Sequence, residues 1–125
     1  MALSESENSA LVSAAFDAWA KGDGNIYDIL ADDVVWTITG SSLVAGTYTS
    51  RQQFLDEAIQ PIFVRLSEPI RPTIRRIITE GNTIVVLWED HAVAKDGQAY
   101  DNRHCWVMRI RGREEEAVAY SIRRR

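Results

Sequence analysis

The stretch LWEDHAVAKDGQAYDNRHCW, Leu87 to Trp106, decides the fold because it reads as two strands joined by a tight turn. Apolar and aromatic residues flank a central Asp96-Gly97, a dipeptide typical of a two-residue hairpin loop. The same stretch holds both histidines of the chain. We therefore ask which polar side chains of this hairpin share a face of the sheet.

A two-residue loop predicts which residues lie opposite each other: His91 pairs with Asn102, and Glu89 pairs with His104. Side chains of a strand alternate between the faces of its sheet. One face is then expected to carry Leu87, Glu89, His91, Val93, Asn102, His104, Trp106 and Met108. The other is expected to carry Trp88, Asp90, Ala92, Asp101, Arg103, Cys105 and Val107. A bulge, or a loop longer by one residue, would reverse this parity.

The first of these faces mixes large apolar groups with a carboxylate, two imidazoles and an amide, which suits the wall of a pocket. Apolar surroundings raise the pKa of a carboxylate, and a neighbouring imidazole can relay its proton. The candidate catalytic residues are Glu89 as base, His104 as its partner, and His91. Asn102 and Arg76 are candidates for orienting a substrate or stabilising an oxyanion. The alternative is a cross-strand pair at the sheet surface, or histidines satisfied within the core.

Three helices are predicted in the first half of the chain. Apolar residues from Leu11 to Trp19 form one helical stripe that ends at Gly22. A short second helix follows, for which Asp23 is the candidate N-cap. After the strand at residues 34–38, Ser50 begins a third helix, and Pro61 is expected to kink it.

The second half of the chain predicts an antiparallel meander. Runs rich in β-branched and aromatic residues span about 71–80, 83–95 and 98–110, with turn signals between them. A turn at Gly81-Asn82 brings Arg76 onto the same face as Leu87. Helices followed by a sheet predict an α+β fold in one domain, residues 1–125, with the helices on one face of a curved sheet.

Composition excludes several classes of function. The chain has 125 residues, 18 acidic and 14 basic, for a net charge of −4, which disfavours nucleic acid as a partner. The single cysteine, Cys105, forms no internal disulfide and cannot build a thiolate-rich metal site. We predict neither a metal nor a cofactor. The sequence lacks a basic segment before an apolar run near its start, and it lacks a membrane-length apolar run, so a cytoplasmic protein is expected.

Two segments carry a family resemblance. They are LADDVVWTITGSSLVAGTYTSRQQFLDEAI, residues 30–59, and VVLWEDHAVAKDGQAYDNRHCWVMRIRG, residues 85–112. Together they resemble the SnoaL-like and ketosteroid-isomerase-like proteins of the nuclear transport factor two superfamily. The resemblance implies a cone-shaped α+β barrel, in which three N-terminal helices and a strongly curved, mostly antiparallel sheet enclose a pocket. It also implies a homodimer formed through the outer sheet face.

Several catalytic positions of this superfamily are not matched. The resemblance sets the base of ketosteroid isomerases at Thr37 or Ile38, and their oxyanion donors near Ala15 and Trp106. The arginine and aspartate of the epoxide hydrolases fall on Glu89 and His91, and their last-strand aspartate falls near Ala119. Neither set of residues is reproduced, so the resemblance predicts the fold and leaves the reaction open.

The sequence supports a small-molecule pocket protein, most simply an enzyme that transfers protons on a mainly apolar substrate, of isomerase, cyclase or hydrolase type. The alternative is a non-catalytic ligand-binding or dimerisation module of the same fold. Apolar outer-face residues favour a homodimer. Aromatic residues at strand and helix spacing are core residues first and cavity residues second. The candidate substrate-binding residues are Trp36, Tyr48, Phe54, Arg76, Asn102, Trp106 and Met108.

Overall fold

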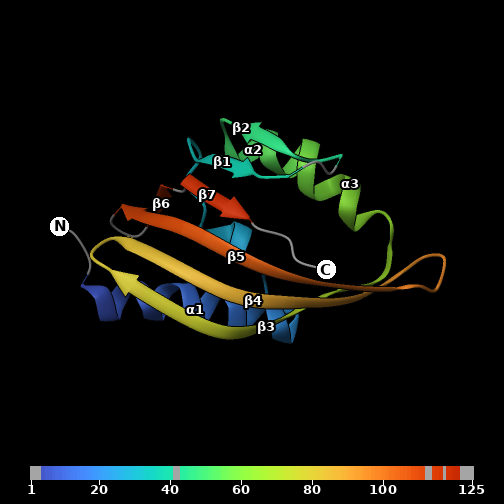
Figure 1. Ribbon diagram of the computed structural model, residues 1–125, viewed down its shortest axis with the longest axis horizontal. Coiled ribbons are helices and arrows are strands. Elements are labelled where there is room, and N and C mark those ends of the chain that lie inside the picture. Colours follow the sequence, from blue (N-terminus) through green and yellow to red (C-terminus); the bar gives the residue numbers. More distant parts are fainter. Residues whose placement is uncertain (1–3, 41–42, 112–113, 117, 122–125) are drawn as a thin grey trace.

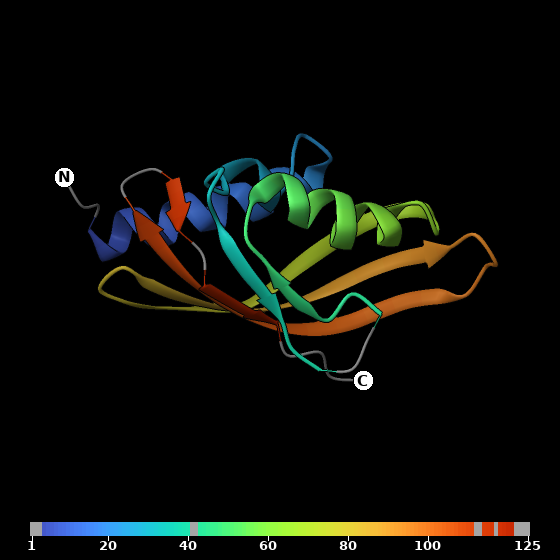
Figure 2. The ribbon, with the colours of Figure 1, turned by 90° about the horizontal axis from the view of Figure 1, so that it is seen from above.

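The computed structural model describes residues 4–40, 43–111, 114–116 and 118–121 of the chain. A four-stranded antiparallel sheet contains β3 (Leu66–Glu80), β4 (Thr83–Ala94), β5 (Ala99–Arg111) and β6 (Glu114–Glu116), in that order. A smaller sheet has the order β2-β1-β7, with β1 (Val35–Ile38) antiparallel to β2 (Gly46–Tyr48) and parallel to β7 (Val118–Ser121). Figure 2 shows the helices on one side of the long, bent strands β3 to β5, which Figure 1 labels.

The first helix, α1 (Glu5–Lys21), is confirmed and has well-formed caps. The Ser4 side chain accepts a hydrogen bond from the Glu7 N–H, and the Glu7 carboxylate accepts one from the Ser4 N–H. Gly22 ends the helix in the left-handed conformation, at φ +81°. Val12, Phe16 and Trp19 form the buried face of the helix.

The described residues contain two long helical segments, where the sequence predicted three helices. The second predicted helix is a single 3-10 turn, η1 (Ile26–Ile29). Asn25, and not Asp23, caps it by accepting a hydrogen bond from the Tyr27 N–H. The last helical segment is continuous from α2 (Arg51–Phe54) through the π-helical turn η2 (Leu55–Ile59) to α3 (Gln60–Phe63). The wider π turn ends at Ile59, two residues before Pro61, which has no N–H to donate to a normal helical bond.

The turn between β4 and β5 is one residue longer than predicted. The Ala94 N–H donates to the Gln98 carbonyl (2.9 Å), and the Gly97 N–H donates to the Ala94 carbonyl (2.9 Å). The loop therefore comprises Lys95, Asp96 and Gly97, and Gly97 adopts the left-handed conformation at φ +85°. A glycine in this conformation is typical of three-residue hairpin loops.

The extra loop residue shifts the register of β4 against β5 by one position. Glu89 lies opposite Arg103, and Trp88 lies opposite His104. The predicted pairing of Glu89 with His104 is therefore wrong. Within β5 the predicted face is confirmed, since Asn102, His104, Trp106 and Met108 all point toward the helices and are buried or half-buried. Their neighbours on β4 are Trp88, Asp90 and Ala92, which the sequence analysis had assigned to the outer face.

The core between sheet and helices is dominated by aromatic rings. Trp106 contacts Trp36 and Trp88, each with ring centroids 4.8 Å apart in edge-to-face geometry. Trp36 also stacks on Phe54 at 4.9 Å. Such pairs add to the stabilisation from burying their area. Within the described residues, no helix is both long and apolar enough to cross a lipid bilayer.

Candidate functional site

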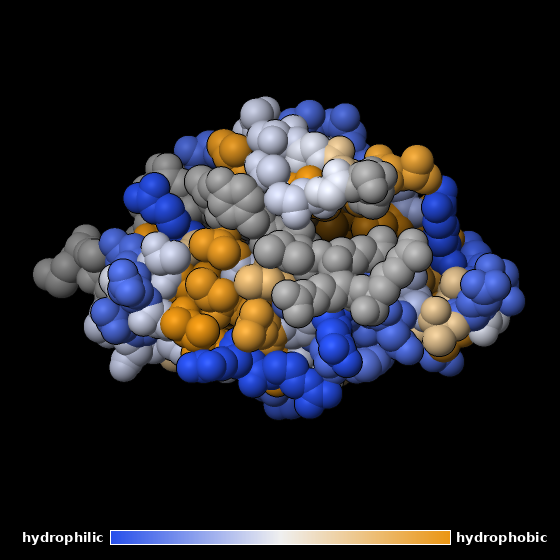
Figure 3. Space-filling model, viewed as in Figure 1, coloured by the Kyte–Doolittle hydropathy of each residue, from blue (hydrophilic) through white to orange (hydrophobic). Residues whose placement is uncertain are grey.

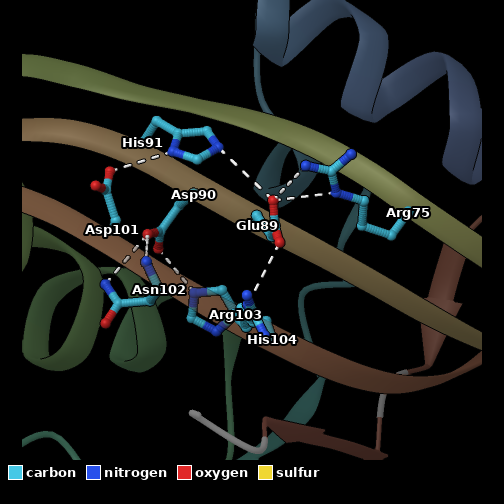
Figure 4. Close-up of polar contacts among 8 residues, drawn as sticks. All are labelled: Arg75, Glu89, Asp90, His91, Asp101, Asn102, Arg103 and His104. Carbon is cyan, nitrogen blue, oxygen red and sulfur yellow. Dashed lines mark hydrogen bonds and ion pairs between the residues drawn. The ribbon is translucent and has the colours of Figure 1, made fainter. Parts of the chain in front are cut away.

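A buried carboxylate on β4, Asp90, is the centre of the inner polar cluster (Figure 4). Its Oδ1 accepts hydrogen bonds from the Asn102 backbone N–H (2.8 Å) and the Asn102 side-chain amide (3.1 Å). Its Oδ2 lies 2.7 Å from Nε2 of His104. Asp90 is 2% exposed, so these bonds replace the water that a buried carboxylate loses.

The local structure positions these three side chains. Asp90 and Asn102 lie directly opposite each other in the β4–β5 ladder, and His104 is the next residue of β5 on the same face. A carboxylate only accepts hydrogen bonds, so this geometry assigns the ring proton to Nε2 of His104. The lone pair of a neutral ring is then on Nδ1.

Aromatic residues hold the imidazole of His104 in place. The Trp88 indole stacks on it with ring centroids 4.3 Å apart and an interplanar angle of 22°. Trp106 lies against it at 6.3 Å. The indole Nε1 of Trp88 is itself buried and has no hydrogen-bond partner among the described residues. A fixed imidazole bonded to a buried carboxylate is an arrangement that can accept and return a proton.

A tyrosine from η1 completes this inner cluster. Burial, followed by the charge of Asp90 and then that of Tyr100, raises the pKa of Tyr27 well above its usual range. Tyr27 is therefore a neutral phenol and a hydrogen-bond donor at any physiological pH. Tyr100 lies beside Asn102 on the same face of β5 and opposite Ala92.

Glu89 belongs to a separate cluster on the outer face of the sheet, which Figure 4 shows beside the inner one. Arg75 donates to Glu89 Oε2 from Nη2 (2.7 Å) and Nε (3.0 Å), and Arg103 Nε lies 3.4 Å from Oε1. These bonds, led by that of Arg75, lower the pKa of Glu89. His91 Nδ1 lies 3.1 Å from the Asp101 carboxylate, and its side chain is 51% exposed. Glu89 and His91 are thus remote from the face that carries His104.

The predicted substrate-binding residues separate in the same way. Arg76 lies opposite Leu87, as predicted, but both residues belong to the outer face of the sheet. The β3–β4 ladder also has a bulge between Ile74 and Arg76. The other predicted residues belong to the interior. Tyr48 donates its hydroxyl to the Val44 carbonyl, and burial raises its pKa. Buried among the other aromatic and apolar groups are Trp36, Phe54, Trp106 and Met108.

Asp90 and Trp88 were not predicted as site residues, because a two-residue loop would place them on the outer face of the sheet. Gly97 is the signal in the sequence that could have indicated the other face, because a glycine at this position is compatible with a three-residue loop as well as with a two-residue loop. Among the described residues, no group of three or more His, Cys, Asp or Glu side chains is arranged to hold a metal ion.

An open pocket of about 600 Å³ lies where α3, the start of β3 and the β4–β5 turn come together. Figures 1 and 2 both show α3 and this turn at the same end of the molecule. Tyr100 links the pocket to the inner cluster, since it lines the pocket and neighbours Asn102 on β5. The lining residues are Leu43, Val44, Pro61, Ile62, Val64, Arg65, Leu66, Ala94, Lys95, Asp96 and Tyr100.

Solved structures with the same fold are numerous at low sequence identity. An NTF2-like protein of unknown function from Burkholderia pseudomallei aligns with a TM-score of 0.77 at 21% identity, covering 98% of this chain and 92% of its own. TerC, co-crystallised with polyporic acid, aligns with a TM-score of 0.74 at 17% identity, covering 94% and 91%. A Catenulispora acidiphila protein with a ketosteroid isomerase-like fold, in complex with trimethylamine, aligns with a TM-score of 0.66 at 17% identity. The alignment covers 90% of this chain and 83% of that protein.

These identities show a common fold and no more. A search of curated protein sequences finds no significant match to the chain. The family model for the SnoaL-like domain matches residues 12–118, which include both strands of the inner cluster, the second half of α1 and the later helical segments. The chain belongs to the SnoaL-like domain family.

Proposed function

We propose that this protein is an enzyme that transfers protons on a small, mainly apolar molecule, with His104 as the base and Asp90 as its partner. The observation that carries the proposal is the 2.7 Å contact between His104 Nε2 and the Asp90 carboxylate. Asp90 is buried, and the Trp88 ring stacks on His104. A carboxylate in this position orients an imidazole and stabilises the imidazolium that forms when the ring takes a proton.

The proposed reaction is proton abstraction next to a carbonyl group. Nδ1 of His104 takes a proton from carbon, the electron pair moves onto the carbonyl oxygen, and the imidazolium returns the proton to the product. Tyr27 is the proposed donor to the oxygen on which negative charge develops, because it is a buried phenol close enough to Asp90 for that charge, after burial itself, to raise its pKa. Asn102 keeps the Asp90 carboxylate in place through two hydrogen bonds.

The test follows deuterium incorporation into a panel of apolar ketones and esters, including 2-tetralone, in heavy water. The wild-type protein should accelerate exchange at the α-carbon over the buffer rate. His104→Gln and Asp90→Asn should bring it back toward that rate, while Glu89→Gln, from the outer face, serves as the matched control and should retain exchange. A wild-type protein that accelerates no member of the panel would count against catalysis.

The second candidate function is a non-catalytic ligand-binding module. It is favoured by the dense aromatic packing of the interior, where Trp36 contacts Phe54 and Trp106, and by the open pocket beside α3, which offers space for a ligand away from His104. In that case a small apolar ligand should raise the melting temperature of the protein by mass action while no member of the ketone panel is turned over.

We further propose a homodimer formed through the outer face of the large sheet. Figure 3 shows apolar side chains gathered on one part of the face in view, with hydrophilic ones below them. The corrected register assigns the apolar residues of this face as Val85, Leu87, Cys105 and Val107, which replace the predicted Trp88 and Ala92. The cluster of Glu89, Arg75 and Arg103 contains both a carboxylate and guanidinium groups. In a two-fold contact, the carboxylate of one protomer would face the guanidinium groups of its partner.

A further inference from the structure

Two cationic residues, Arg65 and Lys95, meet at the open pocket. The Lys95 backbone N–H donates to the Arg65 carbonyl (2.8 Å), which joins the chain after α3 to the β4–β5 turn. Both residues are exposed and line the pocket. Within the described part of the chain, neither forms an ion pair.

The same pocket leaves large apolar side chains in contact with solvent. Leu43 is 91% exposed and Val64 is 50% exposed, and they are two of the four large apolar residues that are exposed among the described residues. Both line the pocket, together with the half-buried Ile62 and Leu66. Exposed apolar groups that gather in a concave surface are typical of a ligand site.

The charges of the pocket favour an anion. The protein as a whole carries a net charge of −4, whereas the lining of this pocket holds two cations, Arg65 and Lys95, and a single carboxylate. The one carboxylate of the lining, Asp96, already accepts a hydrogen bond from the Gln98 N–H (3.0 Å) within the turn. Guanidinium and ammonium groups bind carboxylates through charge-assisted hydrogen bonds.

From these observations we infer that the pocket binds an apolar carboxylic acid in its ionised form. The carboxylate is held by Arg65 and Lys95, and the apolar body lies between Leu43 and Val64 and points toward Tyr100. This inference deepens the proposed function, because it names the class of molecule that would reach the His104 and Asp90 pair through this pocket.

The experiment compares two probes of nearly the same shape, 2-naphthoate and 2-naphthamide, by calorimetry and by NMR of the labelled full chain. Naphthoate should bind about tenfold or more tightly than the amide and should shift the backbone signals of Val44, Ile62 and Tyr100. Arg65→Gln combined with Lys95→Gln should remove this preference and leave the weak binding of the amide unchanged. Arg76→Gln, which removes a cation from the outer face, is the matched control and should keep the preference.

Equal affinity for the two probes, or a preference that survives the double substitution, would overturn the inference. Failure of both probes to bind at millimolar concentration, or signals that shift only outside the pocket, would do the same. Binding of naphthoate should also persist in His104→Gln. If the wild-type protein binds naphthoate but transfers no proton, the proposed reaction fails while this inference stands.

Discussion

Nε2 of His104 lies 2.7 Å from Oδ2 of Asp90, and the two residues come from neighbouring strands on the inner face of the sheet. The side chain of His104 is 14% exposed and that of Asp90 is 2% exposed. Among the described residues, this is the most buried contact between an acidic and a basic side chain. It makes the stability of the sheet and the proposed chemistry depend on the same carboxylate.

Asp90→Ala should destabilise the protein by about 2 to 4 kcal/mol, because it leaves buried donors of Asn102 and His104 without an acceptor. Urea unfolding of the variant and the wild type measures the difference. Glu89→Ala, which removes a carboxylate from the outer face, is the control and should cost clearly less. Equal losses in the two variants would contradict the buried role of Asp90.

The corrected register predicts which carboxylate influences which histidine. Asp90→Asn should change the imidazole NMR signals of His104 and leave those of His91 nearly unaltered. Glu89→Gln should do the reverse, because Glu89 Oε2 lies 3.9 Å from His91 Nε2. Nitrogen-15 spectra should also show His104 protonated at Nε2 in the neutral form. A His104 signal that responds to Glu89→Gln alone would support the two-residue loop after all.

Glu89 should contribute a pH-dependent part of the stability. Its pKa is lowered from 4.5 in the folded protein, chiefly by the hydrogen bonds from Arg75, so the unfolded chain binds its proton more readily. The contribution is present above pH 4.5 and is lost as the pH falls through the lower folded pKa. The stability difference between wild type and Glu89→Gln, measured by urea unfolding, should therefore shrink on acidification. A difference that is constant from neutral pH to pH 3 would argue against this ion pair.

The proposed dimer depends on apolar side chains of the outer face. Leu87→Asp should dissociate it, because a carboxylate would be buried without a partner in the contact. Sedimentation equilibrium should give twice 14.1 kDa for the wild type and 14.1 kDa for the variant. Ser13→Asp, on the exposed side of α1, is the matched control and should remain dimeric. A wild-type protein that stays at 14.1 kDa at micromolar concentration would contradict the proposal.

Gly97→Ala should destabilise the hairpin by about 1 kcal/mol through backbone strain alone. The residue has φ +85°, and an added Cβ would meet no atom within 4 Å, so steric overlap contributes nothing. The midpoint of urea unfolding measures the loss. Gly97→Asn is the control and should cost less, because asparagine tolerates the left-handed conformation better than alanine does. An alanine variant as stable as the wild type would show that the turn adopts another conformation.

Much of the architecture could be predicted because it depends on local patterns. The helical stripe from Leu11 to Trp19 and the strand pattern beyond residue 70 both predicted elements that the structure confirms. The second helix was overestimated, since η1 is a single turn whose length depends on how Ile26 and Tyr27 pack into the core. Its sequence alone does not distinguish one turn from two.

Alternation along β5 determined that Asn102, His104, Trp106 and Met108 share a face, because successive side chains of a strand point to opposite sides. Alternation cannot determine the parity of one strand relative to the next. That relation depends on whether the loop holds two residues or three, and Asp96-Gly97 is compatible with both. In the folded protein the loop has three residues, with Gly97 in the left-handed conformation. This loop places Asp90 rather than Glu89 on the same face as His104. The physical reason is burial, because this register covers Trp88 and leaves Glu89 to the arginines of the outer face.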